Sequence, residues 1–405
     1  MNESKKIVVI GGGAAGFFSA INCKLLHPNY DVSILEKTNK LLSKVLISGG
    51  GRCNVTNYCF DNAQLVKNYP RGEKELLQVF SRFAVKDTIQ WFAEQNIKLK
   101  AEADGRMFPE SNSSETIVNC FLSLAKKLNI EISIQCEVIK IERTENFIIH
   151  TSKGIKHADT VICSLGGHNK IAAYQLLTQL GHKVHQPIPS LFTINLPNES
   201  IKKELQGVAV KQAKVSIDQS KFFYEGPVLV THWGLSGPAV LKLSAFAAPF
   251  FYEHDYKNVI KLNWTGSLKL NEITETLLEQ KKTAARSLIV RTPLFDLPKR
   301  LWEFLIDKAE ISDQLHWSNL PNTQLNKLAN LLFNDNYKME GKTTFKEEFV
   351  TAGGVDLKEV NFKTMESKLI PGLYFCGEVL NIDGITGGFN FQAAWSTAYI
   401  CAQSV

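Results

Sequence analysis

The sequence predicts an α/β protein that begins with a nucleotide-binding domain of the Rossmann type, and three observations support this fold class. Residues 5–10 form a short apolar run, expected to be a strand, that ends in a glycine-rich turn. Residues 14–26 then place apolar side chains at the spacing of a helix face. A second apolar run, residues 31–35, ends at Glu36. A strand, a glycine turn, a helix and a second strand in this order open the dinucleotide-binding fold.

The composition is that of a globular protein with a sizeable core. The 405 residues are 44% hydrophobic and 21% charged, which excludes wholesale disorder and allows two or three domains. The net charge of +6 is too small to indicate nucleic-acid or membrane binding on its own. No apolar run approaches the roughly 18–20 residues of a membrane span, and the polar residues 1–6 leave no room for a signal peptide. The eight cysteines form no CxxC pair and are expected to be reduced thiols of a cytoplasmic protein.

After the opening unit, the first half of the chain alternates loops, helices and strands. Residues 37–72 are predicted to be an irregular loop rich in glycine and asparagine. A helix is predicted from Ser113, with Asn112 as N-cap and Glu115 completing a capping box. The other expected elements are helices at about 73–82, 85–95 and 172–180 and strands at 130–135, 138–142, 147–151 and 156–163.

Pro187 and Pro189 mark the predicted end of the first domain. The elements expected beyond them are strands at 191–196, 208–217, 228–231 and 259–264 and helices at 271–286, 298–308 and 322–333. Residues 266–335 carry nine basic and nine acidic side chains, a balance that argues against a nucleic-acid-binding face. The chain then returns to its first domain through a strand that ends near Gly377, a glycine-rich turn and a last helix at about 390–401.

Gly11, Gly13 and Gly16 fit the dinucleotide-binding pattern G-x-G-x-x-G, and Glu36 stands twenty residues after the last of them. Gly11 permits the tight turn, Gly13 allows backbone N–H groups to approach a pyrophosphate, and Gly16 allows the helix to pack on the strand. The positive end of the helix dipole favours the phosphates, and Glu36 would accept hydrogen bonds from a ribose diol. The alternative interpretation is a glycine-rich turn without a ligand.

The fingerprint does not distinguish NAD from FAD, but the end of the chain favours FAD. A predicted strand ends at Gly377-Glu378, and Gly387-Gly388 precede a helix that starts near Asn390. N–H groups at that helix start would stabilise the N1/C2=O edge of a flavin, which carries negative charge when reduced. The alternative is a glycine-rich loop that caps an ordinary helix.

Five segments make the comparison more specific. They are VVIGGGAAG (8–16) with LEK (35–37), LISGGGRCNVTN (46–57), DGRMFPESNSS (104–114), THWGLSGPAVLKLS (231–244) and the long segment 350–396, which contains YFCGEVL and TGGFNFQ. Together they resemble the BaiN/RdsA-like family of NAD(P)/FAD-dependent oxidoreductases, flavoproteins of the two-dinucleotide-binding-domain type. The segments reach from one end of the chain to the other, and SGGGRCN and TGGFNFQ are the most specific of them.

The resemblance implies a discontinuous Rossmann-like FAD-binding domain with a β-meander, built from residues 1–190 and 345–405. Between these parts it implies an inserted β-barrel, residues 191–267 with a return strand at 336–344, which bears a helical subdomain at 268–335. The strands and helices predicted independently for residues 191–344 agree with this arrangement.

The resemblance also implies, position by position, which residues bind FAD. The ADP half would be held by Gly11, Gly13, Ala15, Gly16, Glu36 and Lys37, with adenine at the backbone of Val138 and the turn from Ser164 through Gly166 close to the cofactor. The flavin and pyrophosphate side would include Lys44, Ser48, Gly49, Arg52, Cys53 and Asn54, the ribityl-phosphate region Gly377 and Glu378, and the flavin ring Gly388, Asn390, Phe391 and Gln392. The sequence departs from the family at Leu42-Ser43 and at His168, which weakens any transfer of one member's substrate.

Two of these residues have more than one interpretation. Arg52 offers a bidentate cation for phosphate or for a reduced flavin, or it is a structural arginine paired with a carboxylate. Cys53 is expected to pack or to contact the cofactor rather than to act as a redox thiol, because Cys59 forms no CxxC pair with it.

Because a flavin carries the redox chemistry, the protein needs to supply only positioning and at most one proton. His232, Glu378 and Asp383 are the candidate acid–base residues, and His232 is preferred because histidine titrates near neutral pH. The alternative for His232 is a structural role in the β-rich insert. Arg106 either anchors an anionic or carbonyl substrate or fixes its own loop.

We therefore expect an FAD-dependent oxidoreductase that reduces a small enone or carbonyl substrate with electrons from NAD(P)H. The sequence has no second G-x-G-x-x-G, so NAD(P)H would bind transiently over the flavin face. Members of the resembled family reduce conjugated enones of the bile-acid type, whereas a related branch oxidises aminoacetone. An oxidase of a small amine or amino-ketone that uses O₂ is thus the second hypothesis.

A flavin-dependent tRNA-modifying protein and a flavin-storing or sensing protein are less favoured alternatives. The expected partner is a small molecule, with no nucleic acid, membrane or metal, and the oligomeric state stays open.

Replacing Gly13 by valine should abolish FAD retention, because the new side chain would occupy the place of the pyrophosphate. The measurement is the flavin absorbance of the purified Gly13→Val protein after gel filtration. A variant that stays yellow would contradict this placement of the cofactor.

Overall fold

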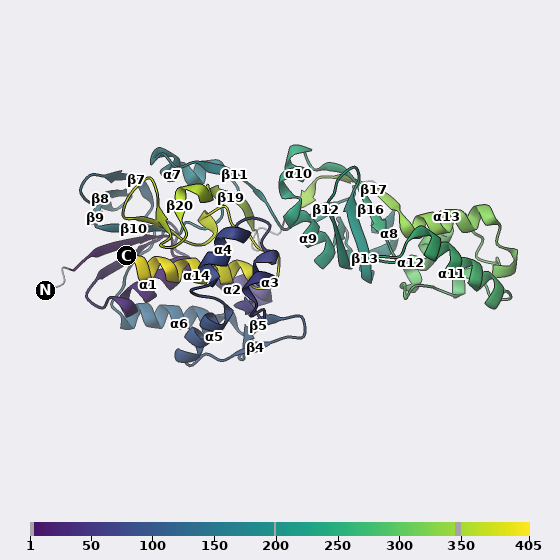
Figure 1. Cartoon of the computed structure of the whole chain (residues 1–405), viewed down its shortest axis with the longest axis horizontal. Helices are drawn as coiled ribbons and strands as arrows, with labels where there is room; N and C mark the ends of the chain where they lie inside the picture. The colour runs from purple at the N-terminus through teal and green to yellow at the C-terminus, as the bar shows by residue number, and fades with distance from the viewer. Residues whose placement is uncertain (1–3, 198–199, 345–349) are drawn as a thin grey trace. The chain divides into compact units, whose positions relative to one another are not determined.

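The computed structural model describes residues 4–197, 200–344 and 350–405. The chain divides into two compact units, one made of Met1–Ser190 with Lys346–Val405 and the other of Leu191–Phe345. In the first unit, elements from the two ends of the chain lie together, as the purple and yellow segments of Figure 1 show. The α/β fold class predicted from the sequence is confirmed.

The core of the first unit is a seven-stranded sheet in the order β20-β21-β22-β10-β1-β2-β6. The strands from β22 to β6 are parallel, and β20 and β21 add an antiparallel edge. Their bounds are β1 (Lys6–Ile10), β2 (Asp31–Leu35), β6 (Glu131–Ser133), β10 (Thr160–Cys163), β20 (Val360–Asn361), β21 (Glu366–Ser367) and β22 (Leu373–Phe375). The predicted opening is confirmed, since α1 (Ala14–Leu26) connects β1 to β2.

Helices and three small sheets surround this core. The other helices are α2 (Ser43–Gly51), α3 (Asn62–Leu65), α4 (Glu73–Phe80), α5 (Val85–Glu94), α6 (Ser114–Lys127), α7 (Gln175–Gln179) and α14 (Phe389–Ser404). The small sheets are β3 (Thr56–Asn57) with β5 (Arg106–Pro109) and β4 (Leu99–Ala101), the meander β7 (Val138–Arg143), β8 (Phe147–Thr151) and β9 (Gly154–Ala158), and the pair β11 (Val184–Pro189) with β19 (Thr351–Val355).

Three sequence predictions are corrected here. Residues 37–72 contain α2, β3 and α3 instead of loop alone, because the apolar positions before Ser48 form a helix that the glycines then interrupt. The segment 156–163, predicted as one strand, belongs to two strands, β9 and β10, which lie in different sheets. Asp159 separates them, and its carboxylate accepts a hydrogen bond from the Lys6 N–H at 2.7 Å. The N-cap of α6 is Ser113, whose side chain accepts from the Glu115 N–H, while Asn112 adopts a left-handed turn conformation.

An aromatic cluster joins helices that are far apart in sequence. The Phe18 ring of α1 lies 4.6 Å from Trp91 of α5 and 5.2 Å from Trp395 of α14, and Phe121 of α6 lies 5.6 Å from Trp395. The indole N–H of Trp395 donates to the carbonyl of Val55 at 2.9 Å, so the buried polar atom is satisfied. Such large buried rings supply much of the burial energy of this unit.

The second unit consists of one antiparallel sheet with helices packed on it. The sheet order is β17-β16-β13-β14-β15-β12-β18. The strands are β12 (Thr193–Asn195), β13 (Ala209–Ile217), β14 (Phe223–Val230), β15 (Gly234–Ser236), β16 (Lys257–Asn263), β17 (Asp335–Glu340) and β18 (Lys342–Thr343), and the helices are α8 (Ile201–Leu205), α9 (Pro238–Phe246), α10 (Ala248–Glu253), α11 (Leu270–Thr283), α12 (Lys299–Lys308) and α13 (Asn322–Phe333). The sequence prediction lacked α9 and α10, which form from an apolar stretch without clear helical periodicity.

None of the described helices is both long and apolar enough to cross a membrane. Closure of the second sheet into a barrel stays a prediction, and so do the domain bounds taken from the sequence.

Asp335 connects the helices of the second unit to its sheet. Its buried carboxylate accepts hydrogen bonds from the Trp264 indole N–H at 3.0 Å and from the Tyr337 hydroxyl, and it pairs with the ammonium of Lys308. A buried carboxylate with this many donors is stable only while all of them remain in place.

Replacing Asp335 by alanine should destabilise the second unit by about 3–5 kcal/mol, because three donors lose their acceptor. The measurement is the urea midpoint of unfolding. Lys211→Ala, which removes an ion pair with Asp296 between two highly exposed side chains, is the control and should leave the midpoint unchanged.

Candidate cofactor site

The turn between β1 and α1 has the shape that a pyrophosphate needs. A Cβ at Gly11, where φ is +112°, would lie 2.3 Å from the carbonyl oxygen of Ser164, and a Cβ at Gly16 would lie 1.9 Å from the carbonyl oxygen of Gly11. A Cβ at Gly13 would meet no protein atom within 4 Å. Gly13 is the N-cap of α1 and forms no side-chain cap. Packing therefore requires glycine at positions 11 and 16, whereas Gly13 lies under open space at the positive end of the helix dipole.

Glu36 is fixed beside this turn. Its carboxylate accepts a hydrogen bond from the Gly12 N–H at 2.8 Å and two more, from the N–H and hydroxyl of Thr38, also at 2.8 Å. The Gly11 N–H donates to the carbonyl of Leu35 at 2.8 Å. These bonds hold an anionic acceptor at the end of β2, which is the position expected for a ribose-binding acid.

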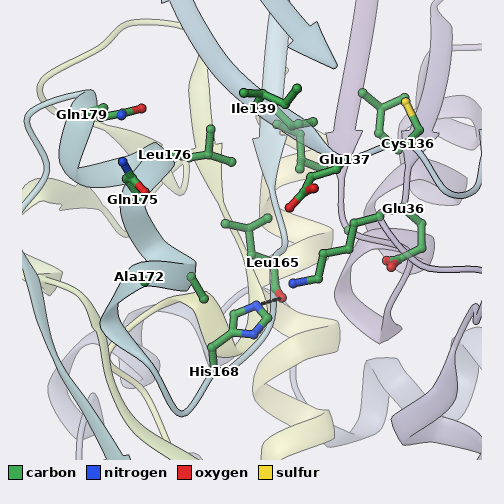
Figure 2. A pocket seen from close by; sticks show the side chains of 16 residues that line it. Glu36, Cys136, Glu137, Ile139, Leu165, His168, Ala172, Gln175, Leu176 and Gln179 are labelled. Atoms are coloured by element: carbon green, nitrogen blue, oxygen red, sulfur yellow. Dashed lines mark hydrogen bonds between the residues drawn. The ribbon is translucent and has the colours of Figure 1, made fainter. Parts of the chain in front are cut away.

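A cavity of about 440 Å³ opens next to Glu36. In Figure 2, Glu36 and Cys136 lie on one side of it and Gln175, Leu176 and Gln179 on the other. The cavity is lined by Ile10, Gly11, Leu35, Glu36, Lys37, Cys136, Glu137, Val138, Ile139, Leu165, His168, Ala172, Ala173, Gln175, Leu176 and Gln179. It thus brings together four predicted ADP-binding residues, Gly11, Glu36, Lys37 and Val138, in a space suited to an adenosine.

His168 is a lining residue that the sequence analysis did not select. One imidazole nitrogen lies 3.0 Å from the carbonyl of Leu165, as the dashed line in Figure 2 marks, and the backbone N–H donates to the Tyr174 hydroxyl at 3.1 Å. Burial, with a smaller contribution from nearby Lys37, lowers the pKa of His168 below its ordinary value. Burial therefore favours the neutral form of the ring. Its position directly after Gly166-Gly167 was the available sequence clue.

The predicted turn above Gly11 is present. The Ser164 hydroxyl lies 2.9 Å from the carbonyl of Ile10 and 3.1 Å from that of Gly11. Gly166 has φ +74°, and a Cβ there would meet no protein atom within 4 Å, so a ligand could approach its backbone. Ser164 therefore holds the turn in place, and Gly166 is the residue whose backbone stays accessible.

The SGGGRCN segment forms a second open loop. Ser48 leaves the helical conformation, and Gly49, Gly50 and Gly51 all have positive φ. A Cβ at Gly50 or Gly51 would meet nothing within 4 Å. The side-chain oxygen of Asn54 is buried and has no hydrogen-bond partner among the described residues. An unsatisfied buried acceptor beside an open glycine loop fits a site where a ligand supplies the donor.

Arg52 and Cys53 take structural positions in this loop. The Arg52 guanidinium pairs with Glu102 at 2.6 Å and lies 3.9 Å from the centre of the Phe108 ring. This is the carboxylate-paired arrangement considered as the alternative for Arg52. Cys53 is fully buried, and that burial raises the pKa of its thiol to about 12. A thiol that stays protonated is a poor nucleophile, which supports packing or cofactor contact over redox catalysis.

Gly377 and Glu378 lie where β22 meets α1. A Cβ at Gly377 would lie 2.7 Å from the Cβ of Ala15. The Glu378 carboxylate accepts from the Lys44 ammonium at 2.6 Å and from the Thr351 N–H at 2.9 Å. The hydroxyl oxygen of Thr351 is buried without a partner among the described residues. Glu378 thus connects Lys44 to the first residue of β19, Thr351, whose hydroxyl oxygen is the second unsatisfied polar atom of the candidate site.

The start of α14 requires a correction. Gly388 is the N-cap, with φ +92°, and no side chain caps the first backbone N–H groups of the helix. Gln392, predicted to flank the flavin ring, is instead fully buried and bonds to Thr56, Thr88 and Ser396. Its place one helical turn inside α14 directs it into the protein. Asn390 holds the backbone of Gly384, and Phe391 stacks on Trp395 at 5.4 Å.

The predicted acid–base and anchoring residues have distinct surroundings. Arg106 pairs with Asp104 at 2.7 Å and with Glu102 at 3.1 Å, two carboxylates of its own loop. Asp383 is fully buried, and burial raises the pKa of its carboxyl while the adjacent Arg71 opposes that shift.

His232 belongs to the second unit, where its ring lies 4.8 Å from that of Trp233. A catalytic role of His232 stays a prediction.

Among the described residues there is no cluster of three or more His, Cys, Asp or Glu that could hold a metal ion.

The chain is similar to known proteins over almost its whole length. Residues 5–404 match the family described as HI0933-like protein Rossmann domain. A ribosomal RNA dihydrouridine synthase from Haemophilus influenzae is 30% identical over 100% of this chain and 99% of its own length. A 3-dehydro-bile acid delta(4,6)-reductase from Clostridium scindens is 26% identical over 98% of both chains. A 3-ketosteroid delta1-dehydrogenase from Sterolibacterium denitrificans shares the fold, with a TM-score of 0.53, 11% identity and 99% coverage of each chain.

Replacing Gly16 by valine should lower the thermal midpoint of the protein without FAD, because the side chain would overlap the carbonyl of Gly11. An overpacking cost of about 2 kcal/mol corresponds to a shift of roughly 5 °C. Gly13→Val is the matched control: it meets no protein atom and should leave this midpoint unchanged while removing FAD. Equal destabilisation by both substitutions would contradict the open space at Gly13.

Proposed function

The chain belongs to the HI0933-like Rossmann family, and we propose that it is an FAD-dependent reductase that uses NAD(P)H to saturate a carbon–carbon double bond conjugated to a carbonyl group. That the chain has the fold of an FAD-dependent oxidoreductase follows from the family. The electron donor, the type of bond reduced and the substrate are the proposal.

The residues present fit FAD at both ends of the cofactor. Open space over Gly13, the fixed carboxylate of Glu36 and the adjoining cavity suit the ADP half. The glycines after Ser48, the unsatisfied oxygen of Asn54 and the uncapped start of α14 suit the flavin half. When bound, FAD would accept a hydride from NAD(P)H and pass it to the substrate.

The single observation that carries the reaction class is the chemistry shared by two full-length relatives. Uracil has a C5=C6 bond conjugated to its C4 carbonyl, and reducing that bond gives dihydrouracil. A 3-oxo steroid with double bonds at positions 4 and 6 is conjugated in the same way. The synthase at 30% identity and the reductase at 26% identity are thus named for the same kind of bond change on different rings.

The chain's own residues would assist this reaction through charge. With FAD bound, the start of α1 would direct backbone N–H groups toward the diphosphate, and the start of α14 would direct others toward the edge of the flavin ring that becomes negative on reduction. Saturating a conjugated bond also requires one proton at the carbon next to the carbonyl. We propose His232 as its donor and Arg106 as a secondary contact for the substrate. NAD(P)H would bind transiently over the flavin.

The first test is an anaerobic absorbance spectrum of the purified protein before and after addition of NADH, then NADPH. We expect flavin bands that bleach with one nicotinamide and recover on addition of a 4-en-3-one steroid or of unmodified ribosomal RNA. Recovery with only one of the two substrates identifies the ring that is reduced. A flavin that stays oxidised, with hydrogen peroxide released from aminoacetone, would support the oxidase alternative instead. A colourless protein that takes up no added FAD would overturn the proposal.

A further inference from the structure

We propose that the rings of Tyr58 and Phe60, on the turn that follows β3, form a stacking platform for a base of single-stranded RNA. This inference rests on the proposed function and names a binding surface for one of its two substrate types. We call Tyr58 and Phe60 the ring pair.

The ring pair is exposed although its rings contact each other. Tyr58 is 57% and Phe60 is 50% exposed, and the ring centres lie 4.6 Å apart at an interplanar angle of 75°. Large aromatic side chains usually gain stability by burial, so two adjacent exposed rings offer an apolar surface that a ligand can cover. An edge-to-face pair leaves ring faces available for stacking.

The backbone that carries the ring pair is held in place. The Tyr58 N–H donates to the carbonyl of Gly105 at 2.7 Å, and the Cys59 N–H donates to the carbonyl of Asn57 at 2.8 Å. Directly after Phe60, the Asp61 side chain caps α3 by accepting from the Ala63 N–H at 2.8 Å. The rings are therefore presented from a defined turn between β3 and α3, and binding loses little backbone entropy.

The same turn is attached to the flavin end of the cofactor site. The Asn57 side chain donates to the carbonyl of Gly387 at 3.0 Å. A Cβ at Gly388 would lie 2.4 Å from the carbonyl oxygen of Thr56, so the start of α14 rests directly on β3. The ring pair thus begins directly after Thr56 and Asn57, the residues that contact Gly388 and Gly387 in the turn expected at the flavin ring.

Two guanidinium groups lie close to the strand that precedes the ring pair, each paired with a carboxylate. Asn57 pairs in register with Arg106, and the guanidinium groups of Arg106 and Arg52 lie 5.5 and 3.9 Å from the ring of Phe108. Both arginines share the carboxylate of Glu102, and the second partner of Arg106, Asp104, is 56% exposed. A phosphate could replace that exposed carboxylate on Arg106 with a charge-assisted hydrogen bond.

Aromatic faces combined with arginine are the recognition chemistry of single-stranded RNA. A steroid substrate is mostly saturated, so it gains less from stacking on aromatic rings than a base does. The charge balance that argued against nucleic acid concerned residues 266–335, which belong to the second unit.

The test is binding of a fluorescein-labelled oligouridylate to the FAD-loaded full-length protein at low and physiological salt. Because base stacking on aromatic side chains contributes to the binding free energy, the affinity of the double variant Tyr58→Ala/Phe60→Ala should be lower by roughly tenfold or more. Exchange of the ring types, Tyr58→Phe/Phe60→Tyr, should restore binding to within about twofold of the wild type, since both rings keep a π-face. Tyr252→Ala is the matched control, because Tyr252 is 45% exposed in the second unit.

Flavin absorbance and bleaching by NAD(P)H are measured on every variant and should be unchanged. Failure of the wild type to bind the oligonucleotide, or binding by the double alanine variant within twofold of it, would overturn the platform. Equal weakening by Tyr252→Ala would do the same. Each of these three results leaves the proposed reduction of a conjugated double bond standing if the steroid reoxidises the reduced flavin.

Discussion

The first unit depends on a close contact at Gly377, where the two ends of the chain meet. The end of β22 approaches α1 so closely that a Cβ at Gly377 would lie 2.7 Å from that of Ala15 and 3.9 Å from that of Ala394. Because this contact allows α14 to pack on α1, Trp395 enters the aromatic cluster with Phe18. The glycine turn near the N-terminus and the turn before α14 consequently belong to one compact unit. Residues of the candidate cofactor site that come from the two ends of the chain therefore lie in the same unit.

The sequence predicted the elements whose local pattern has only one interpretation. Strand β1, helix α1 and strand β2 match because an apolar run, a glycine turn and a helical period each determine one conformation. The split at Asp159 was not predicted, because the residue pattern of 156–163 does not show that the chain moves there from the meander into the parallel sheet. Helix α2 was missed because Gly49 to Gly51 obscure the helical residues before them.

For the site, sequence position identified residues better than it identified their roles. Gly11, Glu36, Lys37 and Val138 do line one cavity. The resemblance could not show that the Gln392 side chain faces the protein interior, because a motif gives the residue type and not its direction along the helix. His168 lines the cavity from a turn after Gly167 that differs from the family, so no motif predicted it as a site residue. Asn54 was selected by resemblance, and its unsatisfied buried oxygen gives that selection a physical basis.

The discontinuity of the first unit has a consequence during protein synthesis. Strand β10 is central in the sheet, and its neighbour β22 begins at Leu373. At about 5–20 residues per second, the ribosome adds β22 roughly 10–40 s after β10. During that interval β10 presents the unpaired backbone of an apolar edge strand, the type of surface on which chains aggregate. All residues of the second unit are synthesised within that interval. The nascent chain therefore has a defined period in which a chaperone that covers strand edges would increase the yield of folded protein.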